Sequence, residues 1–108
     1  MINIVIYKDS DSNYIGFNVS GHSGYAEAGS DIVCASVSTL VINTINSIEN
    51  FTDDDIEYTV NEEDAVINFI IKGKKSEESL LLLKSLVLGI TFLHEAYSEF
   101  IKIAFKEV

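Results

Sequence analysis

Residues 21–38 contain the side chains from which a thiol nucleophile could be built. The segment reads GHSGYAEAGSDIVCASVS and holds Cys34, the only cysteine of the 108-residue chain, with His22 upstream of it. A cysteine attacks carbonyl carbons as a thiolate, and a nearby histidine can serve as its general base. We therefore interpret Cys34 as a candidate nucleophile and His22 as its candidate base.

Cys34 lies where an irregular segment gives way to a helical pattern. Residues 20–31 show no hydrophobic periodicity, whereas apolar residues from Val33 to about Asn50 recur at the spacing of one helix face. The unpaired N–H groups and the dipole at a helix start favour a thiolate and can bind a developing oxyanion. The pattern thus indicates a nucleophile, a base and oxyanion donors, as acyl transfer requires.

Asp31 allows two interpretations. Like Ser30, it is a plausible N-cap of the predicted helix, and in that position it would place Cys34 in the first turn. It could instead accept a hydrogen bond from His22 and orient the imidazole, as the third member of a triad does. Because its charge opposes ionisation of a nearby thiol, a catalytic Asp31 would act through orientation.

The glycines before Cys34 predict a loop that binds substrate. Glycine permits the tight or left-handed turns that such a loop needs, and irregular segments of this length often carry function. Tyr25 could stack on a substrate side chain or anchor the loop. The predicted loop residues are Gly21, Gly24, Tyr25 and Gly29.

The main alternative is a structural role for Cys34, since a free cysteine is often a small buried hydrophobe. His94 falls within a second predicted helix, and we interpret it as structural. One cysteine and two histidines match no structural zinc spacing, and no glycine-rich nucleotide-binding motif occurs. We therefore expect neither a metal nor a cofactor.

The chain carries a strong negative charge. Its formal net charge is −10, and eight of its seventeen acidic residues lie between Glu49 and Asp64. Such a surface repels phosphate backbones and attracts basic proteins or peptides, although an acidic face can also serve solubility alone. We expect no direct binding to nucleic acid.

Composition also bears on the compartment. The longest apolar stretch, Leu80–Leu83, is followed by Lys84 and is too short to span a bilayer. No export signal is recognisable, and a single cysteine fits a reducing compartment. We expect a cytoplasmic protein that does not enter a membrane.

Hydrophobic periodicity predicts a single α+β domain over residues 1–108. Alternating apolar residues indicate four strands, paired as two hairpins, over residues 2–8, 15–19, 56–60 and 65–71. The second helix is expected to start after Ser76, as its N-cap, and to run to about Lys106. The order ββαββα predicts two layers: a four-stranded antiparallel sheet with two helices on one face.

The second predicted helix is apolar nearly all round in its first half and needs burial on more than one side. A kink near Gly89 could achieve this within one chain. A homodimer that covers the exposed apolar stripe is the interpretation we favour.

The segment from Gly21 to Ser38 carries its motif elements in a specific order: Gly-His, Gly-Tyr-Ala, Gly-x-Asp-Ile-Val-Cys-Ala and Val-Ser. This order, with the ββαββα pattern and the chain length, resembles the ribosomal-processing cysteine protease (Prp) family. The resemblance implies that Cys34 is the nucleophile, His22 the base and Asp31 an associated acidic residue. It also implies a homodimer from low-GC Gram-positive or related bacteria.

The resemblance further implies a substrate. Enzymes of this family remove the N-terminal extension of large-subunit ribosomal protein number twenty-seven after an apolar, Phe-rich segment, so the partner would be that extended precursor. Two other functions stay open. One is a non-catalytic dimeric module that binds ribosomal proteins or assembly intermediates, and the other is a thiol-dependent hydrolase or transferase for small acyl substrates.

Overall fold

The computed structural model describes the backbone of residues 1–21 and 30–108 and the side chains of residues 1–21 and 32–108. Four residues of the predicted site therefore lie outside the described residues, namely His22, Gly24, Tyr25 and Gly29. The side chain of Asp31 also lies outside them.

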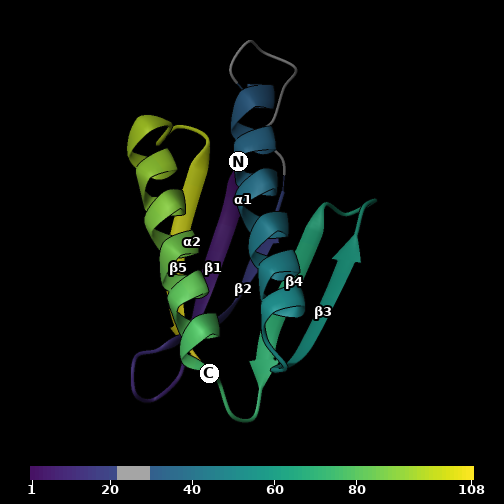
Figure 1. The fold of residues 1–108 in the computed structure, drawn as a ribbon. Coiled ribbons are helices and arrows are strands. Elements are labelled where there is room, and N and C mark those ends of the chain that lie inside the picture. Colours follow the sequence, from purple (N-terminus) through teal and green to yellow (C-terminus); the bar gives the residue numbers. More distant parts are fainter. Residues whose placement is uncertain (22–29) are drawn as a thin grey trace.

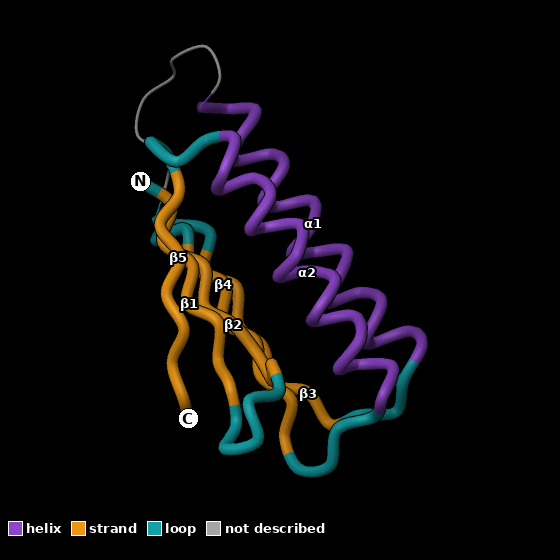
Figure 2. The backbone as a smooth tube through the Cα atoms, turned by 90° about the vertical axis from the view of Figure 1, so that its left-hand side faces the viewer, coloured by secondary structure: helices purple, strands orange, loops and turns teal. Residues whose placement is uncertain are grey.

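In the described part of the chain, two helices and five strands form two layers (Figure 1). In chain order they are β1 (Ile2–Lys8), β2 (Tyr14–Ser20), α1 (Ser30–Phe51), β3 (Asp55–Asn61), β4 (Val66–Lys72), α2 (Glu77–Ala96) and β5 (Ile101–Glu107). Both helices lie on one face of the sheet (Figure 2). The strand order is β3-β4-β2-β1-β5, with β1 and β5 parallel and the other neighbours antiparallel.

This arrangement confirms the α+β class with both helices on one face and corrects the predicted sheet. The four predicted strands and their two hairpins are present. The sheet, however, is five-stranded and mixed, so the prediction of four antiparallel strands was wrong.

The additional strand comes from the end of the second predicted helix. α2 ends at Ala96 rather than near Lys106, and Tyr97 leaves the helix with φ −135° and ψ 47°. Beyond it, Ile101 and Ile103 are β-branched residues at alternate positions, which suit a strand, and β5 pairs with β1 along its whole length. No glycine or proline marks this helix end, so the apolar pattern alone made the predicted helix too long.

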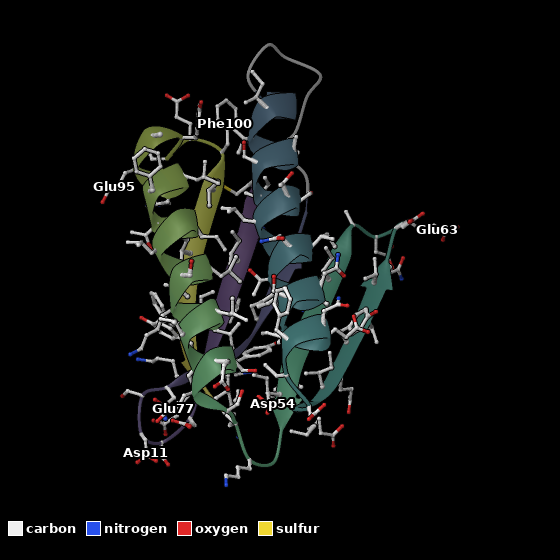
Figure 3. The ribbon with its side chains drawn as sticks, viewed as in Figure 1. Asp11, Asp54, Glu63, Glu77, Glu95 and Phe100 are labelled. Carbon is white, nitrogen blue, oxygen red and sulfur yellow. The ribbon has the colours of Figure 1, made fainter. Side chains whose placement is uncertain are left out.

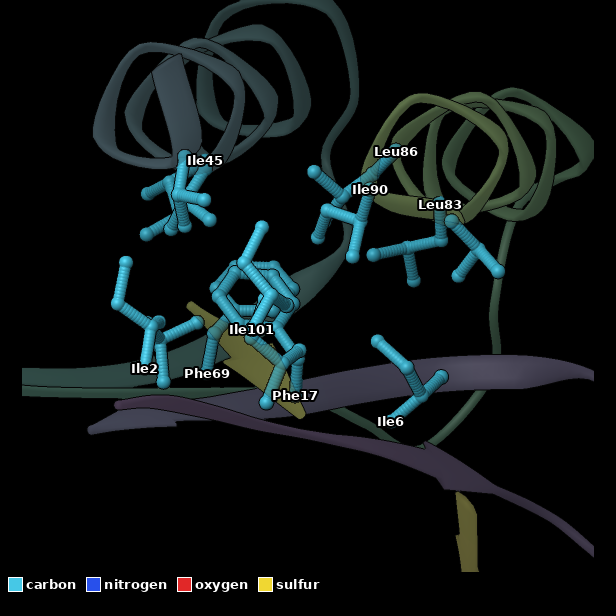
Figure 4. Packing of buried hydrophobic residues seen from close by; sticks show 14 of the residues in the cluster. Ile2, Ile6, Phe17, Ile45, Phe69, Leu83, Leu86, Ile90 and Ile101 are labelled. Carbon is cyan, nitrogen blue, oxygen red and sulfur yellow. The ribbon is translucent and has the colours of Figure 1, made fainter. Parts of the chain in front are cut away.

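The core lies between the sheet and the two helices. Alternate residues of the strands point towards the helices and are buried, among them Ile4, Ile6 and Phe17. The rings of Phe17 and Phe69 stack with centroids 5.2 Å apart (Figure 4). Full burial of one such side chain contributes roughly 1.5–3 kcal/mol, so this layer holds the helices on the sheet.

The two helices approach each other closely at Gly89. A Cβ atom at this position would lie 3.1 Å from Leu40 Cδ1 of α1, and α2 continues unbroken through it. The glycine therefore makes room for the neighbouring helix, in place of the kink considered from the sequence. The outward side of α2 leaves Leu81, Leu88 and Phe92 exposed.

By length and composition alone, α1 and α2 are each long and apolar enough to cross a membrane. Core helices of water-soluble proteins meet the same criterion, and both helices here bury one face against the sheet. Their composition is therefore weak evidence for a membrane location.

A hydrogen-bonded network joins the end of α1 to the start of α2. Ser76 Oγ accepts a bond from Ser79 N at 3.1 Å, which confirms Ser76 as the N-cap of α2. The N–H and hydroxyl of Ser76 donate to Asp54 Oδ2 at 3.0 and 2.8 Å. Partial burial raises the pKa of Asp54, but hydrogen bonds from Ser79 and Ser76 outweigh it, and the pKa lies below its ordinary value of 3.8.

Asp54→Asn should destabilise the protein in a pH-dependent way. Loss of the charged acceptor is expected to lower the free energy of unfolding by about 1–2 kcal/mol at pH 7. Because the folded-state pKa is lowered, the stabilisation is present above the unfolded-state pKa and is lost as the pH falls through the folded-state pKa. Urea unfolding measures the difference in the free energy of unfolding between wild type and Asp54→Asn. This difference should therefore be smaller below about pH 4 than at neutral pH.

Asp53→Asn is the matched control for this prediction. Asp53 is the exposed neighbour in the chain, and its substitution should change the free energy of unfolding by less than about 0.5 kcal/mol. Equal losses in the two variants, or a difference that does not depend on pH, would show that the network does not stabilise the fold through the Asp54 carboxylate.

Candidate active site

Cys34 lies at the edge of the α1 face that packs on the sheet. Val33, Val37 and Val41 belong to that buried face. Cys34 is half-buried: it packs against the core and also lines a pocket. A thiol in this position is neither enclosed by aliphatic side chains nor fully in solvent, so a substrate could reach it through the pocket.

The pocket beside Cys34 has a volume of about 270 Å³ and mainly apolar walls. The start of α1 forms one wall, and the ends of the sheet strands form the others. The lining residues are Ile2, Val19, Gly21, Cys34, Val37, Ser38, Val60, Asn61, Glu62, Ala65, Val66 and Ile67. The hairpin of β3 and β4, the end of β2 and the start of β1 thus meet the start of α1 at one end of the fold (Figure 1).

Gly21 links the segment that precedes α1 to the pocket wall. Its N–H donates to the Ala65 carbonyl oxygen, with N and O 3.2 Å apart, and both residues have positive φ, 88° for Gly21 and 51° for Ala65. A Cβ atom at Gly21 would lie 2.5 Å from the backbone oxygen of Met1, so a larger residue does not fit there. The residue directly before His22 is therefore fixed on the wall of the pocket that Cys34 lines.

The described residues bring together two members of the predicted site, Cys34 and Gly21. The backbone of Asp31 belongs to α1, and its side chain lies outside the described part. His22, Gly24, Tyr25 and Gly29 also lie outside it, so the pairing of His22 with Cys34 stays a prediction.

The helix starts earlier than its sequence pattern predicted. α1 begins at Ser30, so Ser30 and Asp31 are helical residues rather than N-caps, and Cys34 is in the second turn. An acidic residue suits the first turn because it faces the positive end of the helix dipole. In a helix that begins at Ser30, the N–H of Cys34 pairs with the Ser30 carbonyl, so we do not expect it to serve as an oxyanion donor.

Charged groups are sparse at this pocket. Among the described residues that line it, Glu62 alone carries a charge, in the turn between β3 and β4. Figure 3 shows its neighbour Glu63 at the outer tip of that hairpin. His94 lies in the last turn of α2, where a basic side chain suits the helix dipole, and does not line the pocket. The described residues contain no group of three or more His, Cys, Asp or Glu placed to hold a metal.

The sequence pattern did not identify the hairpin of β3 and β4 as part of this site. Val60, Ala65, Val66 and Ile67 supply much of the apolar wall. One indication was available: Tyr58 and Val60 alternate on a strand among acidic residues, and both are exposed in the fold. Their proximity to Cys34 depends on long-range strand pairing, which the local sequence does not show.

Comparison with known proteins places this chain in a family. Residues 1–102 match the sequence model of the cysteine protease Prp family. The chain belongs to this family. The ribosomal processing cysteine protease Prp of Staphylococcus aureus (strain Mu50 / ATCC 700699) is 27% identical over 110 residues, which cover 98% of this chain and 100% of the relative. The Prp of Bacillus subtilis (strain 168) is 35% identical over 48 residues, 44% of this chain and 43% of the relative.

Solved structures share the fold. The Prp protease from S. aureus in complex with a substrate peptide superposes with a TM-score of 0.90 at 22% identity, over 98% of this chain and 100% of that one. SMU.848 from Streptococcus mutans superposes with a TM-score of 0.85 at 30% identity, over 100% of this chain and 96% of that one. The five-stranded mixed sheet with two helices on one face is thus the fold of the Prp family.

Cys34 should react with iodoacetamide faster in the folded protein than in the unfolded chain at neutral pH. The pocket admits a small reagent, and a cysteine that serves as a nucleophile is more reactive than a free one. Because the chain has one cysteine, the intact mass reports the alkylation rate directly, with the chain in concentrated urea as reference. A several-fold faster reaction is expected. A slower reaction in the folded state would assign Cys34 to the packed interior.

Proposed function

We propose that this chain is a cysteine endopeptidase that removes the N-terminal extension of large-subunit ribosomal protein number twenty-seven, after an apolar, Phe-rich segment, during ribosome maturation. The observation that carries the proposal is Cys34 on the wall of an apolar pocket, in a chain of the cysteine protease Prp family. A relative named as a ribosomal processing protease, similar over nearly the whole chain, supports the class of substrate. An apolar pocket is also the type of site that an apolar cleavage segment would need.

Cys34 acts as the nucleophile and His22 as the base in this proposal. His22 takes the thiol proton, and the sulfur attacks the carbonyl carbon of the scissile bond. His22 then gives the proton to the leaving amine as the C–N bond breaks, which leaves a thioester on Cys34. Water, deprotonated by His22, hydrolyses the thioester and releases the extension as a carboxylate.

The segment before α1 supplies the other groups in this proposal. Gly21, Gly24, Tyr25 and Gly29 contact the substrate peptide, and Asp31 orients the His22 imidazole. Backbone N–H groups in the first turn of α1 hold the oxyanion, since the first turn of a helix leaves such donors unpaired. These donors precede Cys34 in the chain, since the N–H of Cys34 itself pairs within a helix that starts at Ser30.

We place the reaction in the cytoplasm, without a membrane, a metal or a cofactor. The partner is the extended ribosomal-protein precursor. A net charge of −10 favours the approach of a basic protein over that of a nucleic acid, which supports a protein substrate without direct contact to RNA.

We also propose that two copies associate through the outer faces of α1 and α2. Leu81, Leu88 and Phe92 follow one another at helical spacing and are 67%, 73% and 69% exposed. Beside them, a groove between the helices is lined by both small and large residues, namely Ile32, Ala35, Ser36, Thr39, Leu40, Gly89, Phe92 and Leu93. A protruding ring and a groove on one patch fit the two-fold, self-complementary contact of a homodimer.

Phe92→Asp should convert the dimer into monomers. A carboxylate in the middle of an apolar contact has no compensating partner on the same patch of the second copy. Sedimentation equilibrium over a range of concentrations should give a dimer for the wild type and at least a 100-fold weaker association for the variant, the loss expected when roughly 3 kcal/mol is removed. Phe51→Asp, at the exposed end of α1, is the control with the same change of charge and should stay dimeric. A monomeric wild type, or a dimeric Phe92→Asp, would contradict this interface.

Cys34→Ala should abolish cleavage of the extended precursor without loss of the fold, because it removes the nucleophile. His22→Ala should lower the rate by about 10²–10⁴-fold, the usual contribution of a general base. Mass spectrometry of the precursor after incubation measures the product, and circular dichroism checks the fold of each variant.

His94→Ala is the control for His22→Ala, since it removes the other histidine, which lies in the last turn of α2 and does not line the pocket, and it should leave the rate unchanged. Appreciable turnover by Cys34→Ala would refute the assignment of the nucleophile. An unprocessed precursor that nevertheless binds the wild-type protein would favour the non-catalytic module, and turnover of small acyl substrates alone would favour the thiol-dependent hydrolase.

A further inference from the structure

β3 forms an open edge of the sheet. It pairs with β4 on one side only, because it is the first strand in the sheet order. Figure 1 shows it at the side of the molecule, beyond α1. Alternate backbone N–H and C=O groups of an edge strand point away from the sheet, so a further strand can pair with them.

The β3 edge lacks the features that commonly prevent pairing with another chain, namely lysine, proline and β-bulges. β3 pairs with β4 residue by residue from Asp55 to Asn61 without a register shift, and its sequence DIEYTVN contains neither lysine nor proline. The opposite edge of the sheet, β5, carries Lys102 and Lys106, and both are exposed. Of the two edges, β3 is therefore the one suited to pairing.

The side chains of β3 define what a pairing strand must carry. Tyr58 lies opposite the buried Phe69, so Tyr58 and Ile56 point to the helix side of the sheet. Tyr58 is 43% exposed there. Asp55 and Glu57 point to the other side of the sheet and are exposed. A strand added at this edge thus meets apolar side chains on one face and carboxylates on the other.

The charge along this edge is negative. Eight acidic residues lie between Glu49 and Asp64, with no lysine or arginine among them. Lys72 of β4 lies opposite Asp55, and its Nζ is 3.9 Å from Glu57 Oε2, with both side chains of this ion pair more than half exposed. One lysine beside eight carboxylates leaves the edge acidic. Opposite charges on adjacent strands attract each other, so basic side chains suit a strand that pairs with β3.

We propose that the outer edge of β3 binds an extended segment of a partner protein as an added strand, and that this segment alternates basic and apolar residues. Its basic side chains lie opposite Asp55 and Glu57, and its apolar side chains lie beside Ile56 and Tyr58. In this mode of binding, main-chain hydrogen bonds provide affinity and alternate side chains provide specificity. The inference concerns a surface in the plane of the sheet and does not depend on the proposed function.

The charge of the edge also disfavours a second copy of this chain as the added strand. Pairing of two β3 edges would bring the carboxylates of both copies together, and like charges on adjacent strands are destabilising. Pairing of β3 with the basic β5 edge of another copy would be a head-to-tail contact, which adds copy after copy unless a ring closes. A net charge of −10 on each copy opposes such growth.

The first test titrates the ¹⁵N-labelled protein with a synthetic peptide of sequence KVKVKVK, capped at both ends. The peptide should shift the amide signals of β3 and β4, and the β3 amides that exchange quickly with solvent in the free protein should become protected. Two control peptides should not bind: EVEVEVE, which reverses the charge, and KVKVKVK with methylated backbone N–H groups, which keeps the charge but cannot form a strand. Binding should also weaken as salt rises from about 0.05 to 0.5 M.

The second test compares Glu57→Lys with Glu95→Lys. Glu57→Lys should raise the Kd for KVKVKVK by roughly 3- to 30-fold, because a favourable cross-strand pair becomes a like-charge pair. Glu95→Lys makes the same change of charge at an exposed position of α2 and should leave the Kd within about twofold of wild type. Circular dichroism checks that both variants keep the fold.

Three results would overturn the proposal. The first is equal binding of the methylated peptide, which would show attraction by charge alone. The second is an equal loss of affinity in the two variants, or amide shifts confined to the helices. The third is assembly of the chain alone into oligomers that Lys102→Glu disperses, which would give the edge to a second copy. None of these measurements uses cleavage, so failure of the proposed function would leave them unaffected.

Discussion

The packing of one face of α1 on the sheet determines where the thiol lies. Val33, Val37, Val41, Ile45 and Ile48 recur at helical spacing and are all buried, so the rotation of α1 about its axis is fixed. With that rotation fixed, Cys34 must lie at the border of the buried face, beside the sheet end and not in the interior. The core therefore positions the candidate nucleophile, and the pocket that it lines follows from the same contact.

The remaining walls of the site come from strand pairing rather than from the helix. β2 lies next to β4, so the end of β2 and the turn between β3 and β4 meet at the same end of the sheet. The Gly21–Ala65 hydrogen bond then extends the pairing of β2 with β4 to the residue before His22. A change in the hairpin can thus reach both Cys34 and the residue before His22, which is why specificity and catalysis are expected to be coupled here.

Local patterns predicted those parts of the molecule that depend on neighbours in the chain. Alternation in β1 and in the hairpins, helical spacing in α1 and the cap at Ser76 were all visible in the sequence. β5 was missed because no breaker separates Ala96 from Ile101, and its strand character depends on pairing with β1. The motif indicated Cys34, but the pocket wall at Val60 and Ala65 arises from long-range register, which a motif does not encode.

Trapping the covalent intermediate tests the central claim, that Cys34 is the nucleophile, most directly. The extended precursor is mixed with the wild-type protein, the reaction is quenched in acid within the first turnover, and the intact mass of the chain is measured. The account predicts an added mass equal to the N-terminal extension less one water, located on the peptide that contains Cys34. Processed precursor without such an adduct, with Cys34→Ala equally active, would contradict it.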